Sequence, residues 1–201
     1  MPRQLRRVLP IARGHRVSPM LACAACFLIA VRSPLAQTET AISPMAGRAD
    51  MNCGQLRDGR PLTYRNTRYG LTMTYPSSFV LDPESIPESG DSARFWTADR
   101  QATAVVIGTA NRLGQSLADL LREARQDVAE NGHGVITYRR RRDNWFVISG
   151  YMAGRIFYQR TMITQGSRVI GNLWIEFPRA MRPCFDDAVT MMSLSFRQGG
   201  P

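Results

Sequence analysis

The sequence has 201 residues and a formal net charge of +10, with 26 basic and 16 acidic residues. Every basic residue is arginine, so the chain can form neither a Schiff base on lysine nor the lysine contact of a phosphate-binding loop. A content of 44% hydrophobic and 21% charged residues excludes an integral membrane protein and a wholly disordered chain. The length suits one domain with a tail.

The first 36 residues have the pattern of a secretory signal peptide. They contain six arginines and no acidic residue, and the apolar run from Met20 to Val31 is followed by small residues near Ala36. This run of twelve residues is too short to span a bilayer, which needs roughly 20. We therefore expect a periplasmic or secreted protein, cut after Ala36 or alternatively after Ala30, with no stable membrane span after cleavage. A leader retained as an anchor, or a lipoprotein, remains an alternative.

Removal of this leader lowers the formal charge to +4 and leaves one histidine, His133, and two cysteines, Cys53 and Cys184. Such a charge does not require an anionic partner. Two cysteines in an oxidising compartment usually pair, which predicts a disulfide between Cys53 and Cys184. The chain-entropy estimate for a loop of this size is at most about 5 kcal/mol. The alternative, a catalytic thiol, would need His133 as its base.

The predicted elements begin after residues 37–60, which lack periodicity and are expected to be an extended tail. Alternating apolar and polar residues predict two short strands at 62–66 and 71–75. A loop rich in proline, serine and acid follows at 82–91, and then a hairpin with strands at 94–98 and 102–108.

An amphipathic helix is predicted to begin after Ser116, which has the spacing of a capping box with Asp119. Its apolar face runs from Leu117 to Val128, and Asn131-Gly132 is expected to end it in the left-handed conformation. Four more strands joined by short hairpin turns are predicted at 135–141, 145–152, 155–164 and 168–177, with a last helix at about 183–193.

The strand predicted at 145–152 is apolar on both faces, so we expect it to be central, with packing on each side. Consecutive hairpins imply antiparallel pairing. The sequence therefore predicts an α+β fold, with an antiparallel sheet of about six to eight strands and helices packed on it.

The stretch from Tyr64 to Pro76 (YRNTRYGLTMTYP) resembles the opening of PsbP-like domains, N-x-x-Tyr-Gly-Phe-x-x-x-Tyr-Pro. The segments at 144–151, 156–158 and 177–196 are similar to exported bacterial relatives. This resemblance covers about residues 61–197 and implies the α-β-α sandwich that PsbP-like domains share with the Ran-binding Mog proteins. It implies a binding or accessory role and carries no catalytic residues to this chain.

The most conspicuous run of charge is Arg139, Arg140, Arg141 and Arg142. On a strand, Arg139 and Arg141 point one way and Arg140 and Arg142 the other. The run is a candidate site for phosphate, a lipid headgroup or an acidic glycan. The solvated end of a hairpin is the favoured alternative, and since aromatic residues are not interleaved, we expect no nucleic-acid partner.

Two other sets of residues are weaker candidates for a catalytic or metal site. Ser116, Asp127 and His133 have the residue types of a hydrolase triad, but Ser116 is expected to cap a helix and lacks the strand-to-helix elbow. The acidic residues of the 82–91 loop do not have the spacing of an EF-hand, so we predict no metal and no cofactor.

The sequence therefore favours an exported, non-enzymatic binding or accessory module of the bacterial cell envelope, with an unknown envelope protein or ligand as its partner. The alternatives are a small envelope hydrolase and an electrostatic binder of anionic envelope components through Arg139–Arg142.

Overall fold

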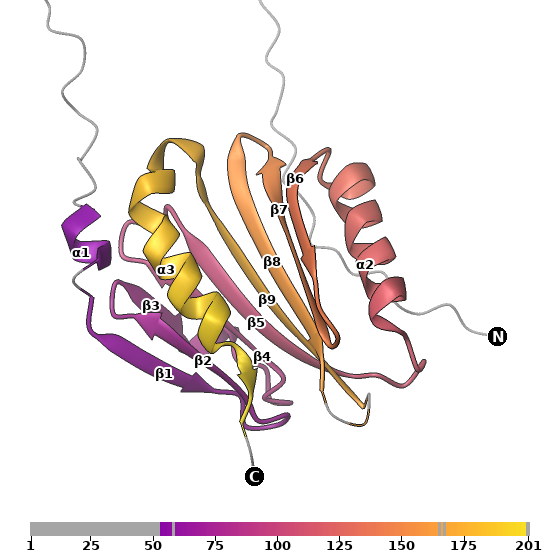
Figure 1. Ribbon diagram of the computed structural model, residues 1–201. Helices are drawn as coiled ribbons and strands as arrows, with labels where there is room; N and C mark the ends of the chain where they lie inside the picture. Colours follow the sequence, from indigo (N-terminus) through magenta and orange to yellow (C-terminus); the bar gives the residue numbers. More distant parts are fainter. Residues whose placement is uncertain (1–52, 58, 165, 167, 200–201) are drawn as a thin grey trace, which may run out of the picture. The chain divides into compact units, whose positions relative to one another are not determined.

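The computed structural model describes residues 53–57, 59–164, 166 and 168–199, which form two antiparallel sheets and three α-helices (Figure 1). The expected signal peptide at 1–36 and residues 37–52 of the expected tail lie outside the described residues. In the part of the chain that the structure describes, no helix is long and apolar enough to cross a membrane.

The larger sheet has seven strands in the order β3-β4-β5-β9-β8-β7-β6, and every neighbouring pair is antiparallel. A smaller sheet has the order β1-β2-β10. The α+β class and the antiparallel pairing are thus confirmed, with the strands divided between two sheets. The strands are β1 (Pro61–Arg65), β2 (Leu71–Pro76), β3 (Phe79–Asp82), β4 (Ser92–Thr97), β5 (Thr103–Ala110), β6 (Val135–Arg141), β7 (Trp145–Met152), β8 (Arg155–Ile163), β9 (Val169–Pro178) and β10 (Arg197–Gln198).

The helices α2 (Leu117–Gln126) and α3 (Arg182–Ser195) cover opposite faces of the larger sheet. Because successive side chains of a strand point to opposite faces, Ile156 packs into the core beneath α3 while its neighbour Phe157 packs into the core beneath α2. The small sheet packs into the α3 core through Leu71 and Met73, which are fully buried. The layers are therefore helix, sheet, helix, as the resemblance implied.

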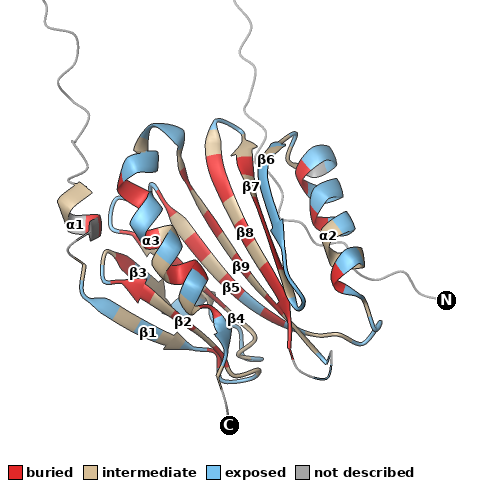
Figure 2. Ribbon diagram, viewed as in Figure 1, coloured by how far each residue is buried: buried red, intermediate tan, exposed pale blue. Residues whose placement is uncertain are grey.

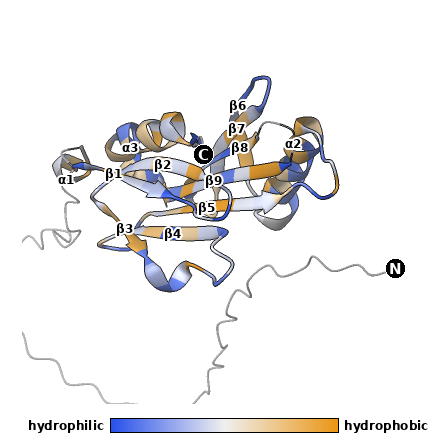
Figure 3. Ribbon diagram, turned by 90° about the horizontal axis from the view of Figure 1, so that it is seen from below, coloured by the Kyte–Doolittle hydropathy of each residue, from blue (hydrophilic) through white to orange (hydrophobic). Residues whose placement is uncertain are grey.

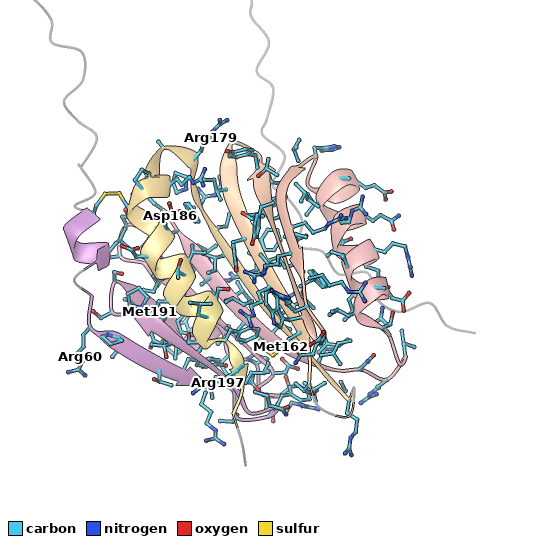
Figure 4. All side chains as sticks on the ribbon, viewed as in Figure 1. Arg60, Met162, Arg179, Asp186, Met191 and Arg197 are labelled. Atoms are coloured by element: carbon cyan, nitrogen blue, oxygen red, sulfur yellow. A yellow bond between two sulfur atoms is a disulfide. The ribbon has the colours of Figure 1, made fainter. Side chains whose placement is uncertain are left out.

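The disulfide predicted between Cys53 and Cys184 is present, with 4.8 Å between the Cα atoms. Cys53 begins α1 (Cys53–Arg57), a short helix that packs against α3 and buries Leu56 in the α3 core. In Figure 4 the bond joins α1 to the upper end of α3. The prediction of an extended chain over 37–60 is therefore wrong for 53–57, where the disulfide and an apolar contact hold one helical turn against the domain.

The capping box of α2 is also present: Ser116 Oγ accepts the Asp119 N–H at 3.2 Å, and the Asp119 carboxylate accepts the Ser116 N–H at 3.0 Å. A π-helical turn, Asp127–Asn131, follows the helix. Gly132 has φ −98°, and it is His133 that takes the left-handed conformation, with φ 45°. The expected left-handed ending at Asn131-Gly132 is wrong, and a Cβ at Gly132 would collide with the Met152 side chain unless that side chain moved.

The strand at 145–152 has packing on both faces as predicted, but its predicted central position is wrong. This strand, β7, is one place from the edge, and β9 and β5 lie nearer the middle. The edge strand next to β7 is β6, most of whose residues are exposed (Figure 2).

Candidate ligand-binding groove

The larger sheet curls so that the β6–β7 hairpin rises on the same side as α3 (Figure 3). We call the space bounded by α3, the segment that follows it (residues 196–199) and strands β6 to β8 the α3 groove. It contains two hollows, one of about 770 Å³ near the C-terminal end of α3 and one of about 470 Å³ near its N-terminal half. Met162 and Arg197 line the lower hollow and Asp186 the upper one, and all three are labelled in Figure 4.

The register of the three strands determines which side chains share this groove. Tyr138 on β6 pairs with Ser149 on β7, and Ser149 pairs with Tyr158 on β8. In the next row on the same face, Val147 lies between Arg140 and Arg160. Two tyrosines and two arginines are thus placed symmetrically on either side of β7.

Arg160 is the most constrained of these groups. Its guanidinium carbon lies 4.5 Å from the centre of the Trp145 ring, and its Nη1 donates to the backbone carbonyl of Ser193 at 2.7 Å. Its Nε is buried and has no hydrogen-bond acceptor. Burial lowers the pKa of Arg160, an effect that the neighbouring Tyr158 partly opposes. The structure therefore holds a half-buried positive charge at the floor of the groove.

The tyrosines of the groove are also held in place. Tyr158 and Ser193 share a hydrogen bond of 2.5 Å between their hydroxyls. Burial raises the pKa of Tyr158, while the bond to Ser193 and the charge of Arg160 act in the opposite direction. At the upper end, the Arg179 guanidinium lies 4.4 Å from the centre of the Tyr151 ring.

The two hollows differ in charge. The lower one is lined by Arg65, Arg160 and Arg197 and by no acidic residue, whereas the upper one contains Arg182 and Asp186, whose side chains are 3.8 Å apart. Cation–aromatic contacts such as that between Arg160 and Trp145 suit the binding of an anionic group beside an aromatic or apolar surface. The groove as a whole can therefore bind an elongated or amphipathic ligand whose charged end lies at the lower hollow.

The arginine run predicted as an anion site is divided by the structure. Arg139 pairs with Ile148 and Arg141 with Phe146, both of which belong to the α2 core, so these two arginines point to the α2 side. Arg140 points to the α3 side and lies 5.9 Å from the centre of the Trp145 ring. Arg142 follows the strand at the hairpin turn and is exposed.

The residues considered for a hydrolase triad are not brought together. Ser116 caps one end of α2 and its hydroxyl bonds Asp119, while His133 is exposed beyond the other end. Ten residues of α-helix separate the two ends by about 15 Å. Asp127 lies at the start of the π-helical turn.

The acidic loop forms a structural turn in which Asp82 caps a 3-10 helix, Pro83–Ser85. Among the described residues, no group of three or more histidine, cysteine, aspartate or glutamate side chains is placed to hold a metal ion. Two tryptophans lie on opposite sides of the larger sheet: Trp174 stacks on Phe157 in the α2 core, and Trp145 lines the groove.

Tyr158 and Arg160, which contribute much of the surface of the groove, were not predicted from the sequence. A usable pattern was present, because Tyr138-x-Arg140 on β6 is repeated as Tyr158-x-Arg160 on β8. Alternation puts both members of each pair on one face. That the two pairs are aligned across β7 depends on the register, which the sequence does not show.

Comparison with known proteins identifies the fold. No protein-family model matches the sequence, and no curated protein matches it significantly. The structure is similar to cyanobacterial PsbP (CyanoP) from Synechocystis sp. PCC 6803, with a TM-score of 0.55 and 12% identity over 70% of this chain and 94% of that chain. It is also similar to the Saccharomyces cerevisiae Ran-binding protein Mog1p, with a TM-score of 0.54 and 8% identity over 70% of this chain and 96% of that chain. The chain thus has a PsbP/Mog1-like fold, as the resemblance of residues 61–197 implied.

Proposed function

We propose that this protein is an exported, non-enzymatic binding module of the bacterial cell envelope, and that its ligand or partner occupies the α3 groove. The observation that carries the proposal is the pair of aligned Tyr-x-Arg patterns that face α3 across β7. Such a surface offers fixed aromatic faces and positive charge at a concave site, which is the usual location of ligand binding.

Two features support export. The first 36 residues have the charge and apolar pattern of a signal peptide. The Cys53–Cys184 disulfide is of the kind that persists in oxidising compartments.

The hydrogen bonding of the groove supports binding over catalysis. The Ser193 hydroxyl lies 3.4 Å from Arg160 Nη1, and its side-chain partners are the Tyr158 phenol and the Arg160 guanidinium. A nucleophilic serine needs a neighbouring base that accepts its proton near neutral pH. A phenol whose pKa is raised above 10 and a guanidinium do not meet that need.

The proposal is tested by retention of molecules from a bacterial envelope extract on the immobilised protein. Thr190→Trp places a bulky side chain at an exposed α3 position that lines the upper hollow, and we expect it to abolish retention. Ala118→Trp makes the same change at an exposed position of α2, on the opposite face, and should retain what the natural protein retains.

Equal retention by the two variants would contradict a role for the groove. The hydrolase alternative predicts a different result, namely labelling of the purified protein by serine- or thiol-directed activity probes. Labelling that is lost in Ser116→Ala or His133→Ala would overturn the non-enzymatic assignment.

A further inference from the structure

We infer that the α3 groove binds a phosphate or carboxylate group beside Trp145, held by Arg160 of the lower hollow and by Arg140 on β6, which contacts the same Trp145 ring, in a ligand whose uncharged part lies against Trp145 and the tyrosines of the upper hollow. The inference rests on the proposed function, because it assigns the ligand chemistry of the same groove. It goes beyond a general attraction to the arginine run, since it selects one arginine of that run and pairs it with an arginine of another strand.

The position of the two charges is the first argument. Their guanidinium carbons lie 4.5 Å (Arg160) and 5.9 Å (Arg140) from the centre of the same Trp145 ring. The two groups are therefore within about 10 Å of each other, roughly one Debye length at 0.1 M salt, so they repel each other. An anion bound close to both guanidinium groups would lower this repulsion.

The lack of compensation is the second argument. Ion pairs within the described part of the chain involve neither Arg140 nor Arg160, and no acidic residue lines the lower hollow. Arg160 is half-buried, and its buried Nε has no acceptor. Burial of a charge or a donor without a partner is unfavourable, and a bound phosphate or carboxylate would supply the missing negative charge.

The surroundings of the two charges indicate what else the ligand carries. Phe196, Met162 and Tyr69 line the lower hollow, and the upper hollow continues the same face with Tyr138, Tyr151 and Tyr158. Aromatic faces next to a cation suit a planar or apolar group joined to the anion. A free inorganic ion would use only the arginines and is expected to bind more weakly.

The test is a calorimetric titration, at about 0.1 M salt, of the protein purified after expression of the full sequence. Phenyl phosphate and benzoate should bind saturably, inorganic phosphate more weakly, and phenol, the uncharged match of phenyl phosphate, undetectably. Vesicles of phosphatidylglycerol and of phosphatidylcholine form a separate arm. Binding of the anionic vesicles that phenyl phosphate displaces would assign the anion to a lipid headgroup, and binding of the free compounds alone would assign it to a small molecule.

The chain offers a matched pair of variants. Arg140→Gln should weaken phenyl phosphate binding about tenfold or more, because a contact to a charged partner is lost. Arg139→Gln removes the same charge from the adjacent residue, which points to the other face, and should change the affinity less than about twofold because its effect is screened. Arg160→Gln should reproduce the loss, with its unfolding midpoint measured in parallel because Arg160 also bonds Ser193.

Equal losses in Arg139→Gln and Arg140→Gln would overturn the inference, since they would indicate attraction to the strand as a whole. Absence of binding by all three anions would also overturn it. If the anions fail to bind while envelope molecules are retained through the groove, only the inference fails. If the anions bind and no envelope molecule is retained through the groove, the proposed function is contradicted but the anion site is still supported.

Discussion

At the N-terminus of α2, the Asp119 carboxylate has more partners than an exposed acid usually has. It accepts the hydroxyl and the backbone N–H of Ser116, and Arg122 donates to it at 2.6 Å. These bonds, that of the Ser116 hydroxyl first, lower the pKa of Asp119 from 3.8 to about 2. Ser116, which was considered as a nucleophile, thus stabilises the charged form of Asp119 instead.

Ser116→Ala is predicted to raise the pKa of Asp119 towards its ordinary value, because the largest cause of its lowering is removed. Since the folded-state pKa lies below the unfolded value, the contact stabilises the folded protein fully above about pH 4, and this contribution is lost as the pH falls towards 2. Titration of the Asp119 carboxyl carbon by NMR measures the shift. A variant whose Asp119 titrates as in the natural protein would contradict the capping assignment, and Arg122→Gln should give a smaller rise.

Residue-level reasoning predicted part of the groove and missed the rest for a physical reason. The alternation of side chains on a strand was enough to separate Arg140 from Arg139. Arg160 is a single arginine in an otherwise mixed strand, and nothing local marks it. Its importance comes from the contact with Trp145 and from its alignment with Arg140, which the pairing of three strands creates.

Among the elements, those with clear periodicity were predicted and those without it were not. The strands β4 and β5 show regular alternation of buried and less buried residues, and both were found. The strand β3 has four residues, β10 has two and α1 has five, too few for a period to be visible. These three elements exist because tertiary contacts hold them, and α1 depends in addition on a disulfide.

The arginines of β6 have a consequence for the strand as an element. β6 is an edge strand with exposed residues, and such edges can pair with other chains. Two copies of β6 pairing edge to edge would bring their arginines together, which opposes self-association. We therefore expect the run to oppose edge-to-edge pairing, which is compatible with anion binding by Arg140 on one face.

The double substitution Arg139→Val with Arg141→Val is predicted to let β6 pair with β6 of a second copy, while Arg140 stays in place. We expect concentration-dependent dimers or larger species, because two charges are replaced by side chains that favour strands. Size-exclusion chromatography with light scattering measures the change. Arg139→Lys with Arg141→Lys keeps the charge and should elute as the natural protein does, and a valine variant with that same elution would argue against a protective role.

On the scale of the whole molecule, the disulfide connects the first described residue to the last helix, with a sequence separation of 131. It encloses the larger sheet, α2 and most of the small sheet within one covalent loop. In the chain-entropy model, closing a long loop restricts the unfolded state more than closing a short one. The folded domain, by contrast, has its cores beneath α2 and α3, and α1 contributes only Leu56 and Cys53 to the second of them.

Cys53→Ala with Cys184→Ala is therefore predicted to lower the free energy of unfolding by about 2–5 kcal/mol without altering the sheets. Urea titration followed by circular dichroism measures the loss, and the natural protein under reducing conditions should behave similarly. Because α1 has only five residues, it is too short to be stable alone, and amide hydrogen exchange at residues 53–57 should become fast in the variant while β8 and β9 stay protected. Unchanged midpoints and unchanged protection of α1 would mean that packing of Leu56, rather than the covalent loop, holds this end of the chain.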